Sequence, residues 1–235
     1  MSILQRAAWP MSGISAGVFA GLSALRGKRV FHPVGRAFTG VFTLAGGAGA
    51  WLPPPLIEVE EREAIVRMSR GAGLPYYLPD VLGLAVKIPD AYGPGSAQDW
   101  LLVTSGTDPV TRHSLIPAFD FMGRTYSSVL PYRVQNRMVT FGARPVGTTD
   151  RVRTFADLER RVRASELVFD FTIAPEGGDH EVIGKLRIVG QLSKETSDQL
   201  RFNPWNTHDE IEPAGSLNQL RRDAYRGSQA ARPDS

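Results

Sequence analysis

The chain has 235 residues, 42% of them hydrophobic, and a formal net charge of +3, which is ordinary for a globular protein and too balanced to indicate a nucleic-acid or membrane-surface protein. Cysteine is absent, which excludes disulfides, thiolate nucleophiles and every metal or haem site that needs a cysteine ligand. Of the 27 basic residues, 23 are arginine. Because the arginine guanidinium can bind a carboxylate or phosphate through two hydrogen bonds, where the lysine ammonium acts as a point charge, the sequence suggests a bound anion. Codon bias is the simpler explanation for the excess of arginine over lysine.

The most apolar stretch, residues 7–25, predicts a packed helix and no membrane span. It contains a proline, three glycines and three serines, which suits a bilayer poorly. Apolar residues recur at helical spacing from Ile14 to Leu25, with Ser12 as a plausible N-cap and Gly27 as a stop. We therefore expect an amphipathic N-terminal helix in a cytoplasmic protein. An export signal is the alternative, weakened by a poorly basic start and no clear cleavage site.

The remaining chain reads mostly as β structure. The expected strands are rich in Val, Ile, Phe and Thr and are bounded by Gly and Pro; they are residues 29–44, 61–69, 81–89, 100–105, 126–134, 137–145, 166–174 and 180–190. Residues 154–165 predict a short helix capped by Thr154, and residues 215–232 a polar C-terminal helix. Many antiparallel strands with one helical insertion predict a β-barrel.

Two motifs that suggest known sites have simpler interpretations. The glycines of Gly46–Gly49 hint at a dinucleotide loop, but the prolines at Pro53–Pro55 follow, so no helix begins there to bind phosphate. His208–Asp209–Glu210 with Glu212 could suggest a metal site. Their spacing fits neither a helix face nor a known ligand pattern, so a solvated loop is the better interpretation.

Three polar residues stand out in the first two expected strands. His32 shares a strand face with Val34, and Arg67 and Ser69 share a face with Ile65. A lone histidine in such a place is usually a satisfied core residue. If both faces turn inward, however, the barrel interior holds a histidine, an arginine and a serine. A buried arginine needs an anion, and neither strand supplies a carboxylate at matching register, so a ligand's carboxylate is a candidate.

The C-terminal helix offers a complementary pair. Arg221 and Tyr225 are four residues apart on one face, and Arg232 lies nearly two turns further along the same face. A neighbouring arginine favours the phenolate, and a bound ferric ion would complete the deprotonation. Tyrosinate is an axial ligand of haem iron in some proteins, although this spacing alone is weak support.

Four segments together resemble the haem catalases. RVFHPVGRAFTGVF (29–42) resembles the family segment that runs Arg-Val-Val-His, Gly, then Phe-Gly-x-Phe. Residues 64–90 are similar to Val-Arg-Phe-Ser followed by Asp-x-x-Gly-Phe-Ala-Val-Lys. Residues 182–190 resemble the Val-Gly-Lys-Leu strand, and residues 200–213 resemble Leu-x-Phe-Asp-Pro-Ser-Asn with Ile-Glu-Pro. The resemblance covers most of the chain from about residue 28 to residue 232.

The resemblance implies a b-type haem (iron protoporphyrin IX) as cofactor. Its distal histidine is His32, held by a hydrogen bond from Ser69, and its proximal metal ligand is Tyr225, next to Arg221. The expected partners of the propionates are three arginines, Arg29, Arg67 and Arg232. The implied fold is α+β and mainly β: an antiparallel β-barrel of the catalase type in a single domain (1–235), made of an N-terminal helix (1–27), the barrel (28–200) and a proximal segment with its helix (201–235).

The departures from the family pattern modify the expected activity. Catalases are usually much longer, so the chain resembles the small catalase-related peroxidases, without the wrapping segment and NADPH site. The distal asparagine is absent, with Ser105 or Thr104 in its place, and the bulky Phe31 precedes the histidine. Both changes should impair the second half of peroxide dismutation. We therefore expect a haem peroxidase with weak or no catalase activity that reduces hydrogen peroxide or organic hydroperoxides with a small-molecule electron donor.

Two alternatives remain open from the sequence. One is a hydroperoxide isomerase of the allene oxide synthase kind, which shares this barrel and needs no reductant. The other is a non-catalytic haem-binding or haem-free barrel. Neither nucleic acid nor a membrane span is expected, and an exposed barrel that lacks its relatives' arm is compatible with a homodimer.

Overall fold

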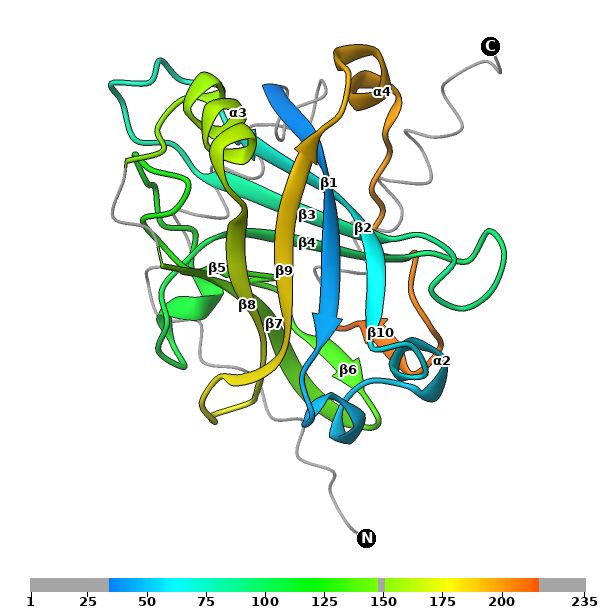
Figure 1. Ribbon diagram of the computed structural model, residues 1–235. Helices are drawn as coiled ribbons and strands as arrows, with labels where there is room; N and C mark the ends of the chain where they lie inside the picture. Colours follow the sequence, from blue (N-terminus) through cyan, green and yellow to red (C-terminus); the bar gives the residue numbers. More distant parts are fainter. Residues whose placement is uncertain (1–33, 148–150, 216–235) are drawn as a thin grey trace, which may run out of the picture.

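An antiparallel sheet closed into a barrel dominates the computed structural model, which describes residues 34–147 and 151–215 (Figure 1). Its strands are β1 (Val34–Leu44), β2 (Glu61–Arg70), β3 (Leu82–Ile88), β4 (Gln98–Thr104), β5 (Tyr126–Ser127), β6 (Tyr132–Val134), β7 (Arg137–Val146), β8 (Leu167–Pro175), β9 (Glu181–Gln191) and β10 (Ile211–Pro213). The strand order is β10-β6-β7-β5-β4-β3-β2-β1-β9-β8, and β8 also pairs with β7. That last pairing closes a ring of eight strands, from which β6 and β10 extend beside β7.

Aromatic side chains fill the inside of this ring. Alternate residues of each strand point inward, and the inward set includes Phe38 and Phe42 of β1 and Trp100 of β4, all fully buried. The ring of Trp100 lies 4.8 Å from that of Phe171 and 5.7 Å from that of Phe141, measured between centroids. An eight-stranded barrel is just wide enough for side chains to fill, so the core occupies the interior and any ligand site belongs on its outside.

One of the three helices expected from the sequence, at residues 154–165, is confirmed. Helix α3 (Phe155–Ala164) begins after Thr154, whose hydroxyl accepts a hydrogen bond from the Asp157 amide at 3.0 Å. The Asp157 carboxylate accepts in return from the Thr154 amide at 2.9 Å. The apolar side of α3 is buried, and Glu159 on the same helix pairs with Arg36 of β1 at 2.8 Å.

Several short elements have no counterpart among the expected ones. They are α2 (Pro54–Ile57), α4 (Lys194–Gln199) and the 3-10 turns η1 (Ala48–Ala50) and η2 (Thr111–His113). Each is too short to show an apolar period. The expected strand 126–134 is wrong as one element, because Val129 has a φ of +59°. That left-handed residue separates β5 from β6.

The helices expected in residues 1–27 and 215–232 lie outside the described residues, apart from Gly215, and so does the first part of the strand expected from residue 29. Within the part of the chain that is described, every helix is too short or too polar to cross a lipid bilayer.

Candidate functional site

The site residues expected in β2 lie on the outside of the barrel. Val66 and Met68 are fully buried in the apolar core, so the alternation of the strand turns Arg67 and Ser69 to the opposite face. The condition that both faces turn inward therefore fails for β2, and the barrel interior does not hold Arg67 or Ser69. The reason is that both faces of β2 carry apolar residues. The face with Val66 and Met68 packs against the large aromatic side chains and therefore points into the barrel.

Small residues line the outer face around Arg67. The strand register places Gly35, Ser69 and Gly83 in one row across β1, β2 and β3. The next row is Ala37, Arg67 and Ala85. We refer to Gly35, Ala37, Ser69, Gly83 and Ala85 as the small-residue shelf. Ala37, Ser69 and Gly83 are buried, and Gly35 and Ala85 are partly exposed. The shelf therefore carries only short side chains beside the one long cationic side chain of Arg67.

Gly35 makes room for the guanidinium of Arg67. A Cβ atom on Gly35 would lie 2.7 Å from Arg67 Cζ and 2.9 Å from the carbonyl oxygen of Met68. Contacts this short are sterically forbidden, so a glycine is needed here for reasons of space. Arg67 pairs with Ala37, so its side chain extends toward Gly35 and the beginning of β1.

Burial lowers the pKa of Arg67, and the charge of Asp198 on α4 opposes that shift. Asp198 lies far along the chain from the first two expected strands, so a search for a carboxylate within those strands misses it. The available signal was Ser193, whose hydroxyl accepts from the Thr196 amide at 3.1 Å and caps α4. A serine before a charged run is a helix-start pattern, but it does not reveal which strand the helix will lie against.

The two candidates for the missing distal asparagine differ in orientation. Thr104 is fully buried on the inner face, and its hydroxyl accepts a hydrogen bond from the Leu82 amide at 3.1 Å. Ser105 follows the last residue of β4, is also buried, and donates to the carbonyl oxygen of Gly106 at 3.1 Å. The alternation of β4 therefore favours Ser105 over Thr104 for the outer face, and its role stays a prediction.

The structure thus brings two of the expected site residues, Arg67 and Ser69, onto one outer face, with Ser105 at the end of a nearby strand. The other expected site residues lie outside the described residues: Arg29, His32, Arg221, Tyr225 and Arg232.

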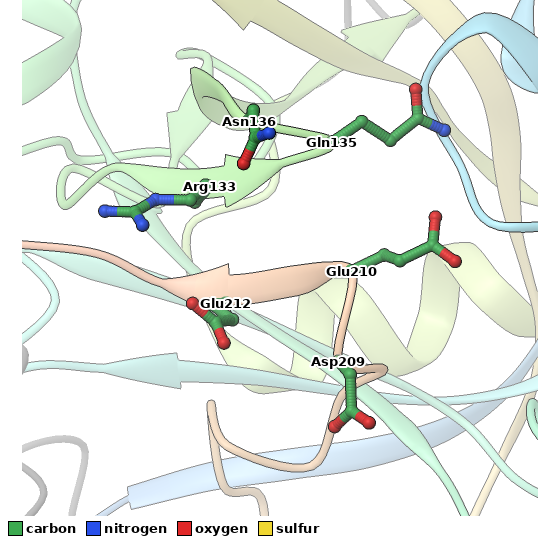
Figure 2. A pocket seen from close by; sticks show the side chains of 6 residues that line it. All are labelled: Arg133, Gln135, Asn136, Asp209, Glu210 and Glu212. Carbon is green, nitrogen blue, oxygen red and sulfur yellow. The ribbon is translucent and has the colours of Figure 1, made fainter.

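The acidic side chains near the end of the described chain do not converge on one point (Figure 2). Asp209, Glu210 and Glu212 line one side of an open depression of about 570 Å³ opposite residues 133–136. Figure 2 shows that the three carboxylates point in different directions and do not converge. Among the residues that the structure describes, no group of three or more His, Asp or Glu side chains could hold a metal ion. The solvated-loop interpretation fits this geometry.

Comparison with known proteins identifies the fold. No family model matches the chain, and no curated protein matches it in sequence. Three solved catalases match its structure at 12% sequence identity over 97% of this chain: a fungal catalase (TM-score 0.66, 65% of its length), catalase A from Saccharomyces cerevisiae (0.70, 67%) and a bacterial catalase (0.70, 63%). The chain therefore has the catalase-type antiparallel barrel expected from the sequence, and it spans about two thirds of the length of these proteins.

Proposed function

We propose that this chain is a haem-dependent peroxidase of the small catalase-related type, with a tyrosinate-ligated b-type haem and weak or no catalase activity. The observation that carries the proposal is the outer face of β1–β3, where Arg67 rises from the small-residue shelf within a catalase-type barrel. The register adds support, because Ser69 pairs with Gly35, which follows His32 by only three positions in the chain.

The described residues fit a haem on three counts. The small-residue shelf carries only short side chains, as a wall against a planar macrocycle requires. The Arg67 guanidinium, seated over Gly35, is a suitable partner for a propionate. The barrel interior is filled by aromatic side chains, so the outer face is the surface that remains for a ligand of this size.

The residues of the chain divide the work as follows. Arg29, Arg67 and Arg232 bind the propionates, and each such charge-assisted contact contributes about 1.5–3 kcal/mol. Tyr225 would hold the haem iron through its phenolate oxygen, and Arg221 would stabilise that phenolate. When bound, the haem supplies the redox chemistry that breaks the O–O bond.

Proton transfer falls to His32. Its imidazole takes the proton of the hydroperoxide O–H group and returns it to the leaving oxygen, so that water or an alcohol departs. Ser69 holds the imidazole in position for both transfers. With two electrons from an outside donor and two protons, a hydroperoxide is converted into an alcohol and water. Ser105 offers a hydroxyl where an amide is expected, which favours donor oxidation over dismutation.

Two variants and one matched control test this assignment. Tyr225→Phe should bind little haem or show an altered Soret band, because the axial oxygen is lost. His32→Ala should retain haem but lose its reactivity with peroxide in rapid-mixing spectroscopy. Tyr77→Phe, at a tyrosine that is 78% exposed in a loop, should match the wild type in both assays. Unaltered turnover in His32→Ala would remove His32 from the mechanism.

Product analysis separates the peroxidase from the two alternatives. Oxidation of an added donor in step with peroxide consumption supports the proposal. Conversion of a lipid hydroperoxide without any reductant indicates an isomerase, and a haem-loaded wild type that consumes neither substrate indicates a binding protein.

A further inference from the structure

Two neighbouring residues at the beginning of β4 make contacts that the proposed site does not use. Asp99 is fully buried, and its Oδ2 accepts hydrogen bonds from the Asn203 amide at 2.8 Å and from Asn206 Nδ2 at 3.0 Å. Lys87 of β3, directly opposite in the register, approaches Oδ1 to 2.7 Å and Oδ2 to 2.9 Å. The Asp99 amide donates in turn to the Asn206 carbonyl at 2.8 Å.

Gln98 holds the same segment from the other face of β4. It is fully buried, and its Oε1 accepts from the Thr207 hydroxyl at 2.8 Å and from the Tyr92 hydroxyl at 2.7 Å. Consecutive strand residues point to opposite faces, so the two side chains reach the segment from both faces. We call this set the β4 clasp: Gln98 and Asp99 with Asn203, Asn206 and Thr207.

Burial of a carboxylate here needs an explanation other than stability. Burial raises the pKa of Asp99, against the hydrogen bonds from Lys87, Asn203 and Asn206, which lower it. A buried ion pair is often no more stabilising than apolar side chains of similar size. Its bonds are directional, however, and those of Asp99 reach a backbone amide and a side-chain amide of one segment. The arrangement is suited to fixing where that segment runs.

The position of the clasp in the chain indicates what it serves. The clasped segment runs from α4 down to β10, passing the β3–β4 strands (Figure 1). Strand β10 ends at Pro213, twelve residues before Tyr225. Lys87 and Asp99 also lie on the outer face, in the row of paired residues next to the row that holds Arg67. Arg67 pairs with Ala85, and two positions along the strands Ile65 pairs with Lys87, which pairs with Asp99. The clasp therefore joins the outer face that carries the small-residue shelf to the segment that precedes Tyr225 in the chain.

We propose that Asp99 is a positioning residue for the proximal side of the haem site: through Asn203 and Asn206 it sets the path of the segment that leads to Tyr225. This inference rests on the proposed function. It assigns Asp99 no contact with peroxide, so the loss of its carboxylate acts on haem retention and on the axial bond, while the chemistry at His32 is left intact.

The test cuts the clasp from each side. Asn206→Ala combined with Thr207→Val removes the two clasp bonds to Asp99 and Gln98, and with them the bond from the Thr207 hydroxyl to the Ile211 carbonyl, without touching the barrel core. Asp99→Asn keeps the shape of the side chain but removes its charge. The matched control is Asp170→Asn, because Asp170 is also a strand carboxylate paired to an arginine, Arg144, at 2.9 Å, and it makes no recorded bond to residues 203–207.

Two readouts distinguish positioning from general stability. Haem transfer to apomyoglobin measures retention, and the ligand-to-iron absorption band reports the axial bond. We expect both clasp variants to lose haem about tenfold faster than wild type, which corresponds to a barrier to haem release lower by about 1.4 kcal/mol. We also expect their ligand-to-iron absorption band to be shifted. Amide hydrogen exchange of residues 203–213 in the haem-free protein should be faster by a similar factor in both variants and unchanged in Asp170→Asn.

The outcomes separate the inference from the proposed function. A wild type that binds haem while both clasp variants retain it equally well, with an unshifted band, overturns the positioning role alone. The same conclusion follows if the variants lower only the melting temperature of the holoprotein. A wild type that binds no haem overturns the proposed function and the positioning role with it.

Discussion

Replacing Gly35 with alanine should disturb the small-residue shelf while leaving the barrel intact. The new Cβ would lie 2.7 Å from the Arg67 guanidinium carbon and 2.9 Å from the Met68 carbonyl oxygen. The guanidinium can move, because it is the far end of a flexible side chain. The carbonyl belongs to the backbone of the paired strand, so β1 and β2 must shift apart at this point.

The size of the effect follows from these two contacts. Overpacking by one methyl group costs about 1–3 kcal/mol, which for a protein of this length lowers the melting temperature by roughly 2–4 °C per kcal/mol. The displaced guanidinium would also lose its contact with a propionate, which contributes about 1.5–3 kcal/mol. Haem affinity should therefore fall by about tenfold to a hundredfold.

The assay compares thermal unfolding and haem titration of Gly35→Ala with those of Gly47→Ala. Gly47 has a φ of −85°, and a Cβ there would meet nothing within 4 Å, so this control should stay within about 0.5 kcal/mol of wild type. If Gly35→Ala melts and binds haem as Gly47→Ala does, the shelf is not tightly packed against Arg67 and the reasoning fails.

Three further variants test other parts of the fold. Trp100→Ala should cost about 3–5 kcal/mol in denaturant unfolding, because the indole fills the centre of the barrel; a loss below about 1 kcal/mol would mean that the core collapses around the gap. Thr154→Ala should cost about 1 kcal/mol by removing the cap of α3, and an unchanged denaturant midpoint would contradict that. Burial, with the charges of Arg112 and Arg144, holds the pKa of His180 below its usual 6.5. The unfolded chain therefore takes up the proton first, and stability present above about pH 6.5 is lost as the pH falls through the folded pKa; denaturant midpoints measured across this range should fall less in His180→Gln, and equal slopes would refute the assignment.

The sequence predicts the strands of the barrel better than their faces. Strand positions follow from local composition and turn residues, as in the hairpin of β3 and β4. Which face of β2 points inward does not follow from local composition. Ile65 and Val66 are both strongly apolar, and only long-range packing against the aromatic core decides which of them is inside. The break between β5 and β6 could not be predicted either, because valine rarely adopts the left-handed backbone conformation that Val129 has.

The site was predictable in part for a related reason. Motif resemblance compares residue types in order and does not depend on the third dimension, so it singles out Arg67 and Ser69, whose roles stay predictions. The β4 clasp could not be predicted, because Asp99 meets Asn203 and Asn206 only after about a hundred intervening residues have folded. Short polar segments such as α4 carry no period from which such a contact could be inferred.

The most direct test of the account is the absorption spectrum of the purified protein titrated with haemin. We predict that binding saturates at one haem per chain and gives the spectrum of a ferric haem with a tyrosinate ligand, and that Tyr225→Phe abolishes this spectrum. A wild-type titration without saturation, or a spectrum that Tyr225→Phe leaves unchanged, would contradict the proposed haem site.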